Sequence, residues 1–138
     1  MTVPPPPPAV KHLAREMDDV AREFYRRWSE DGVLATTRCE RCAETRFPPR
    51  SHCGRCGASQ VWVTLPATGR LHAFTTQEGA LRFAAPWVLA LAEVGDVTIP
   101  GVVEQPYESL HIGQEVGVAP HPEPDTGLTL VRFEPAGR

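Results

Sequence analysis

The spacing of apolar residues near the amino terminus predicts one amphipathic helix. Apolar side chains recur there at intervals of four, three, four and four residues, at Leu13, Met17, Val20, Phe24 and Trp28. This spacing places them on one stripe of a helix, with charged residues on the opposite face. We expect the helix to run from about residue 10 to about residue 29 and to end at Asp31-Gly32, because glycine tolerates the left-handed conformation of a helix end. Two interpretations stay open: the stripe covers the protein's own core, or it docks on a partner protein.

The pattern beyond the helix predicts short strands separated by turns. Apolar, β-branched or aromatic runs occur at 33–37, 61–65, 70–76, 86–94, 98–104, 115–119 and 128–133. Turn signals such as Thr68-Gly69 and Ile112-Gly113 separate several of them. We expect 61–65 and 70–76 to pair with each other, and the nearly continuous apolar run 86–94 to be buried on both faces. Pro100 should place its strand at an edge or a bulge.

These elements together predict a mainly β protein. An N-terminal α-helix is followed by a small ribbon and then by a Greek-key OB-fold barrel. We expect three parts: a proline-rich lead-in and helix at 1–37, the ribbon at 38–58 and the barrel at 59–138. The lead-in contains five consecutive prolines, Pro4 to Pro8, which fit a stiff extended segment rather than a helix or a central strand.

The most specific chemical signal is a set of four cysteines. They form two Cys-x-x-Cys pairs separated by ten residues: Cys39, Cys42, Cys53 and Cys56. Each pair can present two thiolates from one tight turn, and two facing turns make a tetrahedral four-sulfur site of the zinc-ribbon type. Gly57 follows the second pair, whereas Ala43 stands at the matching position of the first turn, which is therefore less suited to folding its amides toward the sulfurs.

The sequence gives less support to other uses of the cysteines. Disulfides need an oxidising compartment, and the amino terminus shows no secretory signal. A redox role for either pair is not favoured, because neither lies at a βαβ junction. A rubredoxin-like iron site has the same ligands and geometry as a zinc site, so iron stays open. We expect one structural zinc ion, and no metal catalysis, because four protein sulfurs leave no open coordination position.

Charge is distributed unevenly along the 138 residues, whose net charge is -3. Residues 38–56 contain five arginines and two acids, whereas residues 57–138 contain four arginines, no lysine and nine acids. An OB-fold that grips single-stranded nucleic acid needs basic residues interleaved with aromatics. A nucleic-acid-binding module is therefore the alternative function rather than the favoured one.

The sequence lacks the motifs typical of membrane proteins and of several classes of enzyme. No apolar run approaches the roughly 20 residues that a membrane helix needs. Without a secretory signal, we expect a cytoplasmic protein. The five histidines are scattered, and the chain contains no nucleophile elbow, phosphate loop or dinucleotide fingerprint. We therefore expect that the chain is not itself an enzyme.

The order of motifs resembles a known family. The shared features are an aromatic helix end at Phe24–Trp28, Phe-Pro-Pro-Arg at 47–50 between the two Cys-x-x-Cys pairs, the 86–90 strand, Leu-His-Ile-Gly at 110–113, and Phe-Glu-Pro at 133–135. From Phe24 onward the chain resembles the acyl-CoA-associated family called domain of unknown function 35 (DUF35). The resemblance implies a rubredoxin-like zinc ribbon joined to an OB-fold, with Cys39, Cys42, Cys53 and Cys56 as the metal ligands.

The resemblance also implies a partner. Members of this family associate with thiolases, lipid-transfer-protein-like aldolases or ketoacyl-synthase-like enzymes, and are not thought to be catalytic themselves. The resemblance therefore implies a heterotetramer of two chains and two thiolase-fold subunits, which handles acyl-CoA substrates.

Charge and shape suggest where an acyl-CoA could bind. The candidate contacts to the CoA phosphates are Arg38, Arg46 and Arg50. The candidate lining of an acyl path is Phe74, Phe83 and Trp87. The simpler interpretation is that the arginines balance thiolate charge and that the aromatic side chains fill the core.

Overall fold

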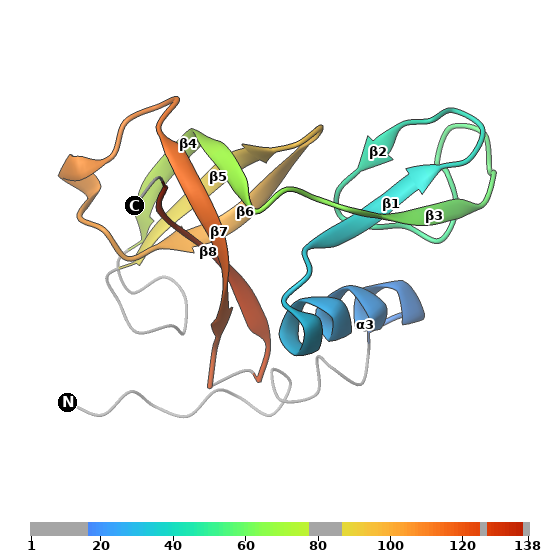
Figure 1. Ribbon diagram of the computed structural model, residues 1–138, viewed down its shortest axis with the longest axis horizontal. Helices are drawn as coiled ribbons and strands as arrows, with labels where there is room; N and C mark the ends of the chain where they lie inside the picture. Colours follow the sequence, from blue (N-terminus) through green and yellow to red (C-terminus); the bar gives the residue numbers. More distant parts are fainter. Residues whose placement is uncertain (1–16, 78–86, 125–126, 137–138) are drawn as a thin grey trace.

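The described part of the chain forms three units: a helix, a small ribbon sheet and a closed barrel. The computed structural model describes residues 17–77, 87–124 and 127–136. Helix α3 lies below the ribbon sheet, and the barrel lies beside both (Figure 1). The helical elements are α3 (Asp19–Arg26), a π-helical turn η1 (Arg27–Asp31) and a 3-10 turn η2 (Tyr107–Ser109). The strands are β1 (Ala35–Cys39), β2 (Thr45–Arg46), β3 (Gln60–Thr64), β4 (Thr68–Gln77), β5 (Trp87–Val94), β6 (Val97–Val103), β7 (Glu115–Pro122) and β8 (Thr129–Pro135).

The helix begins later than its apolar stripe predicts. Asp18 has an extended backbone, and its carboxylate accepts a hydrogen bond from the amide of Ala21 at 2.8 Å. An aspartate in this role caps a helix and satisfies one of its unpaired amides, so α3 starts at Asp19 and the prediction of a helix running through residue 18 is wrong. Residues 10–16 lie outside the described residues. The predicted end is confirmed, since Gly32 adopts a left-handed φ of 67° after η1.

The described end of the apolar stripe packs on the protein's own core. Phe24 and Trp28 are only 6% and 2% exposed. The Trp28 indole donates a hydrogen bond to the carbonyl of Leu130 in β8 at 3.0 Å, which ties the helix to the barrel. Met17 and Val20 are partly buried, and Leu13 lies outside the described residues. At Phe24 and Trp28 the stripe therefore covers the protein's own core.

The ribbon sheet has the strand order β2-β1-β3. Strand β3 pairs with β1, with Trp62 opposite Thr37, so the predicted pairing of 61–65 with 70–76 is wrong. The reason is that side-chain pattern predicts a strand but not its partner. The amide of Leu65 still bonds to the carbonyl of Leu34 at 2.8 Å, so the ribbon sheet continues up to the segment that enters β4. The division of the chain at residues 37 and 58 stays a prediction.

The barrel is closed by five strands in the order β4-β5-β6-β8-β7, and β4 also pairs with β7. This arrangement confirms the mainly β, OB-type architecture predicted from the sequence. Its interior contains fully buried side chains from β4, β5, β6, β7 and β8: Leu71, Val94, Ile99, Val116 and Phe133. Strand β6 lies between β5 and β8 in the closed barrel, so the prediction that Pro100 places its strand at an edge or a bulge is wrong. Pro100 is tolerated because β8 pairs with β6 only at Val102 and Val103, which leaves Pro100 paired on one side alone.

Strand β5 is buried on one face, not on both as its composition predicts. Val88, Ala90, Ala92 and Val94 are buried, whereas Leu89 and Glu93 are partly or fully exposed and Leu91 is 40% exposed. A barrel strand has one inward and one outward face, so the apolar residues on its outer face need another element to cover them.

In the part of the chain that the structure describes, no helix is long and apolar enough to cross a membrane.

A glycine in β6 should be required by packing. A Cβ at Gly101 would lie 2.6 Å from Cε2 of Phe133 and 2.8 Å from the carbonyl oxygen of Val131. We expect Gly101→Ala to lower the free energy of unfolding by about 1–3 kcal/mol, because overpacking forces the ring or a strand to move. Chemical denaturation of the metal-loaded protein measures this change.

The matched control is Gly117→Ala in β7. A Cβ there would lie 3.5 Å from Cγ of Glu134, which is ordinary contact. A loss in the Gly117 variant as large as that in the Gly101 variant would contradict the packing explanation.

Candidate metal centre and adjoining apolar cavity

The two Cys-x-x-Cys segments fold into matching turns. Cys39 ends β1, and its carbonyl accepts a hydrogen bond from the amide of Ala43 at 2.9 Å. The carbonyl of Cys53 accepts the equivalent bond from the amide of Gly57, also at 2.9 Å. Each first cysteine in turn donates its amide to the carbonyl five residues later, at 3.0 Å for Cys39 and 2.9 Å for Cys53. Equivalent backbone bonds therefore hold the two turns in the same shape.

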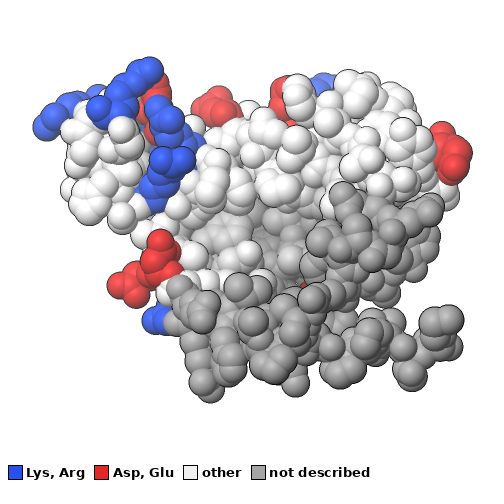
Figure 2. Space-filling model, turned by 180° about the vertical axis from the view of Figure 1, so that it is seen from behind, with Lys and Arg blue, Asp and Glu red and all other residues white. Residues whose placement is uncertain are grey.

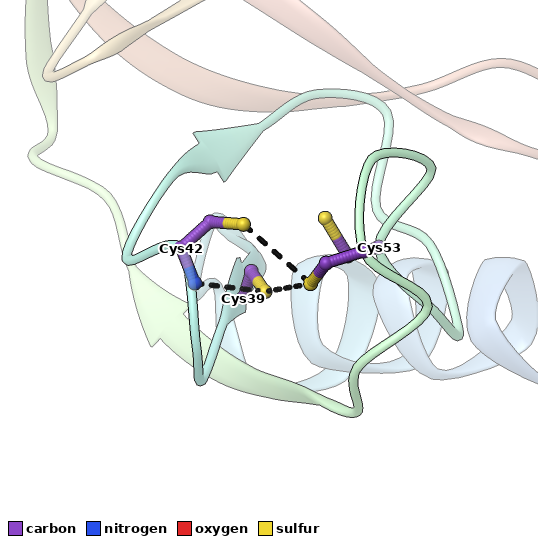
Figure 3. A group of neighbouring side chains, drawn as sticks. Cys39, Cys42 and Cys53 are labelled. Atoms are coloured by element: carbon purple, nitrogen blue, oxygen red, sulfur yellow. Dashed lines mark hydrogen bonds between the residues drawn. The ribbon is translucent and has the colours of Figure 1, made fainter.

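The four cysteine sulfurs converge between these turns. All four Sγ atoms lie within 4.8 Å of one another, and Sγ of Cys56 lies 3.5 Å from those of Cys39 and Cys42. In Figure 3, Cys39 and Cys42 point toward Cys53, which lies on the facing loop. A tetrahedral site with metal–sulfur bonds of about 2.3 Å has sulfur–sulfur edges of about 3.8 Å. The cluster therefore fits a four-coordinate, thiolate-preferring metal ion.

Backbone amides favour the thiolate form of the first cysteine of each pair. The amide of Cys42 donates to Sγ of Cys39 at 3.2 Å, and that of Arg55 donates to Sγ of Cys53 at 3.4 Å. Hydrogen bonds from the amides of Cys56 and Arg55 lower the pKa of the Cys53 thiol from 9.0 to about 6. The amide of Cys42 is the main cause of the lowered pKa of Cys39.

Cys42 has the opposite tendency. Its thiol donates to Sγ of Cys56, and this contact is the main cause that raises its pKa to about 12. The turns therefore stabilise thiolates at Cys39 and Cys53, whereas Cys42 needs the positive charge of a metal ion before it loses its proton at neutral pH.

The basic side chains of the ribbon fall into two groups. Glu44 accepts hydrogen bonds from Arg46 and from Arg55, so the two guanidinium groups share one carboxylate. Arg38, Arg41 and Arg50 are exposed and have no acidic partner among the residues that the structure describes. The structure thus separates Arg46 from the other two predicted phosphate contacts. Figure 2 shows basic side chains gathered over the ribbon end of the molecule, and an uncharged surface over its middle.

An apolar cavity of about 830 Å³ lies where the three units meet. Its walls come from α3, from the ribbon loop that joins the two cysteine pairs, and from the outer face of the barrel. The largest apolar contributors are Phe24, Tyr25, Phe47, Phe74, Leu91 and Leu130. The Phe24 and Phe47 rings meet edge to face with centroids 5.6 Å apart, so the helix and the ribbon close one side together. The exposed outer residues of β5 form the opposite wall.

Of the three residues predicted to line an acyl path, one has a described side chain, and the acyl path itself stays a prediction. Phe74 lines the cavity, and its ring meets that of Tyr107 at 5.2 Å. Phe83 lies outside the described residues, as does the side chain of Trp87, whose backbone begins β5. Sequence reasoning missed Tyr25, Phe47 and Leu91. The Phe47-Pro48-Pro49 motif was a signal for the second of these, since three stiff apolar residues in a ribbon loop need a surface to cover.

A strained alanine in the first cysteine turn makes a testable case. Ala43 has a left-handed φ of 60°, where its counterpart Gly57 has 74°. This conformation costs a residue with a Cβ about 1–2 kcal/mol. We expect Ala43→Gly to stabilise the metal-loaded protein by about 0.5–1 kcal/mol, after allowing for the larger unfolded-state entropy of glycine. Thermal unfolding measures the change.

The matched variant, Gly57→Ala, should lose about 1 kcal/mol for the same reason. A destabilised Ala43→Gly protein would show that the first turn owes its shape to contacts of the Ala43 methyl group instead.

Comparisons with known proteins agree with this geometry. Residues 30–61 match the family described as ChsH2, rubredoxin-like zinc ribbon domain. No curated protein matches the chain. Among solved structures, a chain named Ltp2-ChsH2(DUF35) aldolase has a TM-score of 0.75 and 24% identity, covering 88% of this chain and 98% of that one. A DUF35 protein of unknown function from Sulfolobus solfataricus has a TM-score of 0.63 and 14% identity, covering 91% and 92%. The resemblance seen in the sequence is thus confirmed: the chain carries a ChsH2-type rubredoxin-like zinc ribbon at residues 30–61 and has the fold of DUF35 structures.

Proposed function

We propose that this chain is a non-catalytic, zinc-binding subunit that associates with a thiolase-fold enzyme and helps to bind or present acyl-CoA substrates. The observation that carries the proposal is the apolar cavity of about 830 Å³ at the meeting point of helix, ribbon and barrel. Cavities of roughly 300–1,000 Å³ with mostly apolar walls are typical of small-molecule sites. An acyl group is an apolar ligand suited to such walls.

The proposed partner rests on similarity. The name Ltp2-ChsH2(DUF35) aldolase joins a DUF35 protein to an aldolase, and that chain shares the fold along nearly its whole length. We infer an equivalent partner here: a thiolase, a lipid-transfer-protein-like aldolase or a ketoacyl-synthase-like enzyme. A heterotetramer in the cytoplasm is the simplest assembly that fits the expectations from the sequence.

The proposed ion is zinc. Four thiolates in a tetrahedron suit zinc and also iron, and a structural zinc ion is the commoner occupant of such ribbons. With four sulfur ligands the ion would have no position for water or substrate, so its role would be to fold the ribbon. Any chemistry on the acyl group would then belong to the partner enzyme.

The two ends of an acyl-CoA call for different surfaces. CoA phosphates need unpaired cations, and Arg38 and Arg50 are exposed without an acidic partner in the described part of the chain. Arg46 is less suited than predicted, because Glu44 already pairs with it. The amide of Arg50 donates to Oγ1 of Thr37 at 2.8 Å, which fixes its backbone directly after Pro49 in the cavity wall. Arg50 is thus placed between the basic ribbon and the apolar cavity.

The nucleic-acid alternative gains nothing from the barrel. Arg132 lies 3.2 Å from Glu134 and 3.9 Å from Glu104, and Arg70 donates to the carbonyl of Gly113. Both barrel arginines in the described residues therefore already have partners. A single-stranded nucleic acid needs cations that are free to contact phosphates.

Metal and partner should depend on the same cysteines. Affinity purification of the tagged chain from its native cytosol should recover a thiolase-fold protein and about one zinc per chain, as four thiolates predict. We expect Cys53→Ser to lose the metal and the partner together, because a ribbon without its ion does not fold. Metal analysis and mass spectrometry of one eluate measure both.

The matched control is Ser51→Ala, an exposed position in the same loop. A Cys53→Ser protein that keeps its partner without metal would contradict a structural role for the ion. Recovery of iron with the wild-type chain would overturn the assignment of zinc. Recovery of nucleic acid alone would overturn the proposed function.

Two substitutions should test separately the contacts of the acyl end and of the CoA end of the ligand. Leu91 is 40% exposed and lines the cavity, so Leu91→Glu should keep the fold while placing a carboxylate in an apolar site. We expect it to weaken acyl-CoA binding by the complex about tenfold or more and to leave free CoA unaffected, because burying an unpaired charge is costly. Arg50→Ala should weaken the binding of both acyl-CoA and free CoA. Calorimetry measures each affinity.

The control is Arg70→Ala on the barrel, which should change neither affinity. Unchanged acyl-CoA binding by the Leu91 variant would remove the cavity from the proposal. Unchanged CoA binding by the Arg50 variant would remove the phosphate contact.

A further inference from the structure

The elements described above do not include the proline run at the amino terminus. Five consecutive prolines, Pro4 to Pro8, precede α3 along the chain. We propose that the apolar cavity is also a binding site for polyproline-type segments, and that its occupant in the absence of an acyl ligand is this chain's own proline run.

The walls of the cavity have the chemistry that such segments need. Proline-rich segments dock in grooves lined by aromatic side chains, which pack against the flat pyrrolidine rings. Phe24, Tyr25, Phe47 and Phe74 supply four aromatic rings to this one cavity. Large exposed apolar surfaces on small proteins usually mark interaction sites, so an apolar cavity of this size favours a bound segment or ligand.

A polar group is available where a proline segment needs one. The carbonyls of a polyproline helix have no internal hydrogen bonds and so accept from outside donors. The Tyr25 hydroxyl has no hydrogen-bond partner among the residues that the structure describes. Burial raises the pKa of the Tyr25 phenol, so the group keeps its proton and can donate.

The length and starting point of the segment allow it to reach the cavity. Asp18, the cap of α3, lines the cavity, so the preceding chain starts at its rim. The eight residues between Pro8 and Met17 span up to about 26 Å when extended, and five prolines in a polyproline helix measure about 16 Å. The connecting stretch carries Lys11 and Arg15, opposite in charge to Asp18.

Attachment to the same chain makes a weak contact sufficient. A short linker holds its segment at an effective concentration in the millimolar range, so an intrinsic dissociation constant near 1 mM already gives substantial occupancy. The docked prolines would then compete with an acyl group for the same walls. That competition rests on the proposed function, whereas the docking itself does not.

The test compares two versions of the full-length, zinc-loaded chain by heteronuclear NMR without any ligand. In one version Pro4 to Pro8 are all replaced by serine. We expect amide chemical-shift changes at cavity residues such as Tyr25, Leu91 and Leu130, and none at Val116, which is buried inside the barrel and does not line the cavity. Introducing Leu91→Glu into both versions should abolish the difference between them, because the groove is then blocked in each.

Three results would overturn the inference. Shift changes confined to residues next to the prolines would mean that the segment does not dock. Changes that grow with protein concentration would mean that the prolines of one chain dock on a second copy. Changes that persist undiminished in the Leu91→Glu background would place the docking site elsewhere. A failure of acyl-CoA to bind the complex would sink the proposed function and leave this shift map intact.

Discussion

Convergence of four cysteine sulfurs on one point is the constraint on which the rest of this structure depends. The ribbon has only three short strands, one of them two residues long, and too few apolar residues to fold by burial alone. The backbone bonds of the two turns bring the sulfurs together, and a bound ion would neutralise charges that otherwise repel. The loop between the turns carries Phe47, Pro48 and Pro49, which form one wall of the cavity. The shape of the apolar site is therefore linked to the metal centre through a single loop.

Helix α3 connects this loop to the barrel. Phe24 meets Phe47 on one side, and Trp28 donates to the Leu130 carbonyl on the other. Arg27 strengthens the link to the ribbon, since its guanidinium lies 4.8 Å from the centroid of the Trp62 ring. A hydrogen bond to Glu23 at 2.6 Å, within the helical segment, holds this guanidinium in place. The hydrogen bonds from Arg26 and Arg27 hold the pKa of Glu23 at about 2, so this carboxylate is charged throughout the physiological range. The helix thus contacts both of the other units, and the cavity lies where the three units meet.

Residue pattern predicted the elements well and their partners less well. The cysteine spacing is local information, since each pair lies on one turn, and the structure gathers all four sulfurs. The strand pattern is also local, and the OB-type barrel followed from it. By contrast, β3 pairs with β1 instead of β4 because of the path of the chain around the ribbon, which no side-chain pattern encodes. The outer face of β5 was misjudged for a related reason: an apolar outer face beneath a neighbouring unit has the same composition as a strand buried on both sides.

The cavity itself could not have been predicted from the sequence. Its walls come from residues 18 to 131, and each wall residue has an ordinary explanation as part of the core when it is considered alone. Only their arrangement shows that Leu91 and Phe74 face a space and not a packed interior. Under the proposed function, the same arrangement would also account for the uneven charge of the chain. A ligand with an anionic end and an apolar end is best matched by a surface on which unpaired arginines adjoin an uncharged cavity, and the loop from Phe47 to Arg50 places the two next to each other.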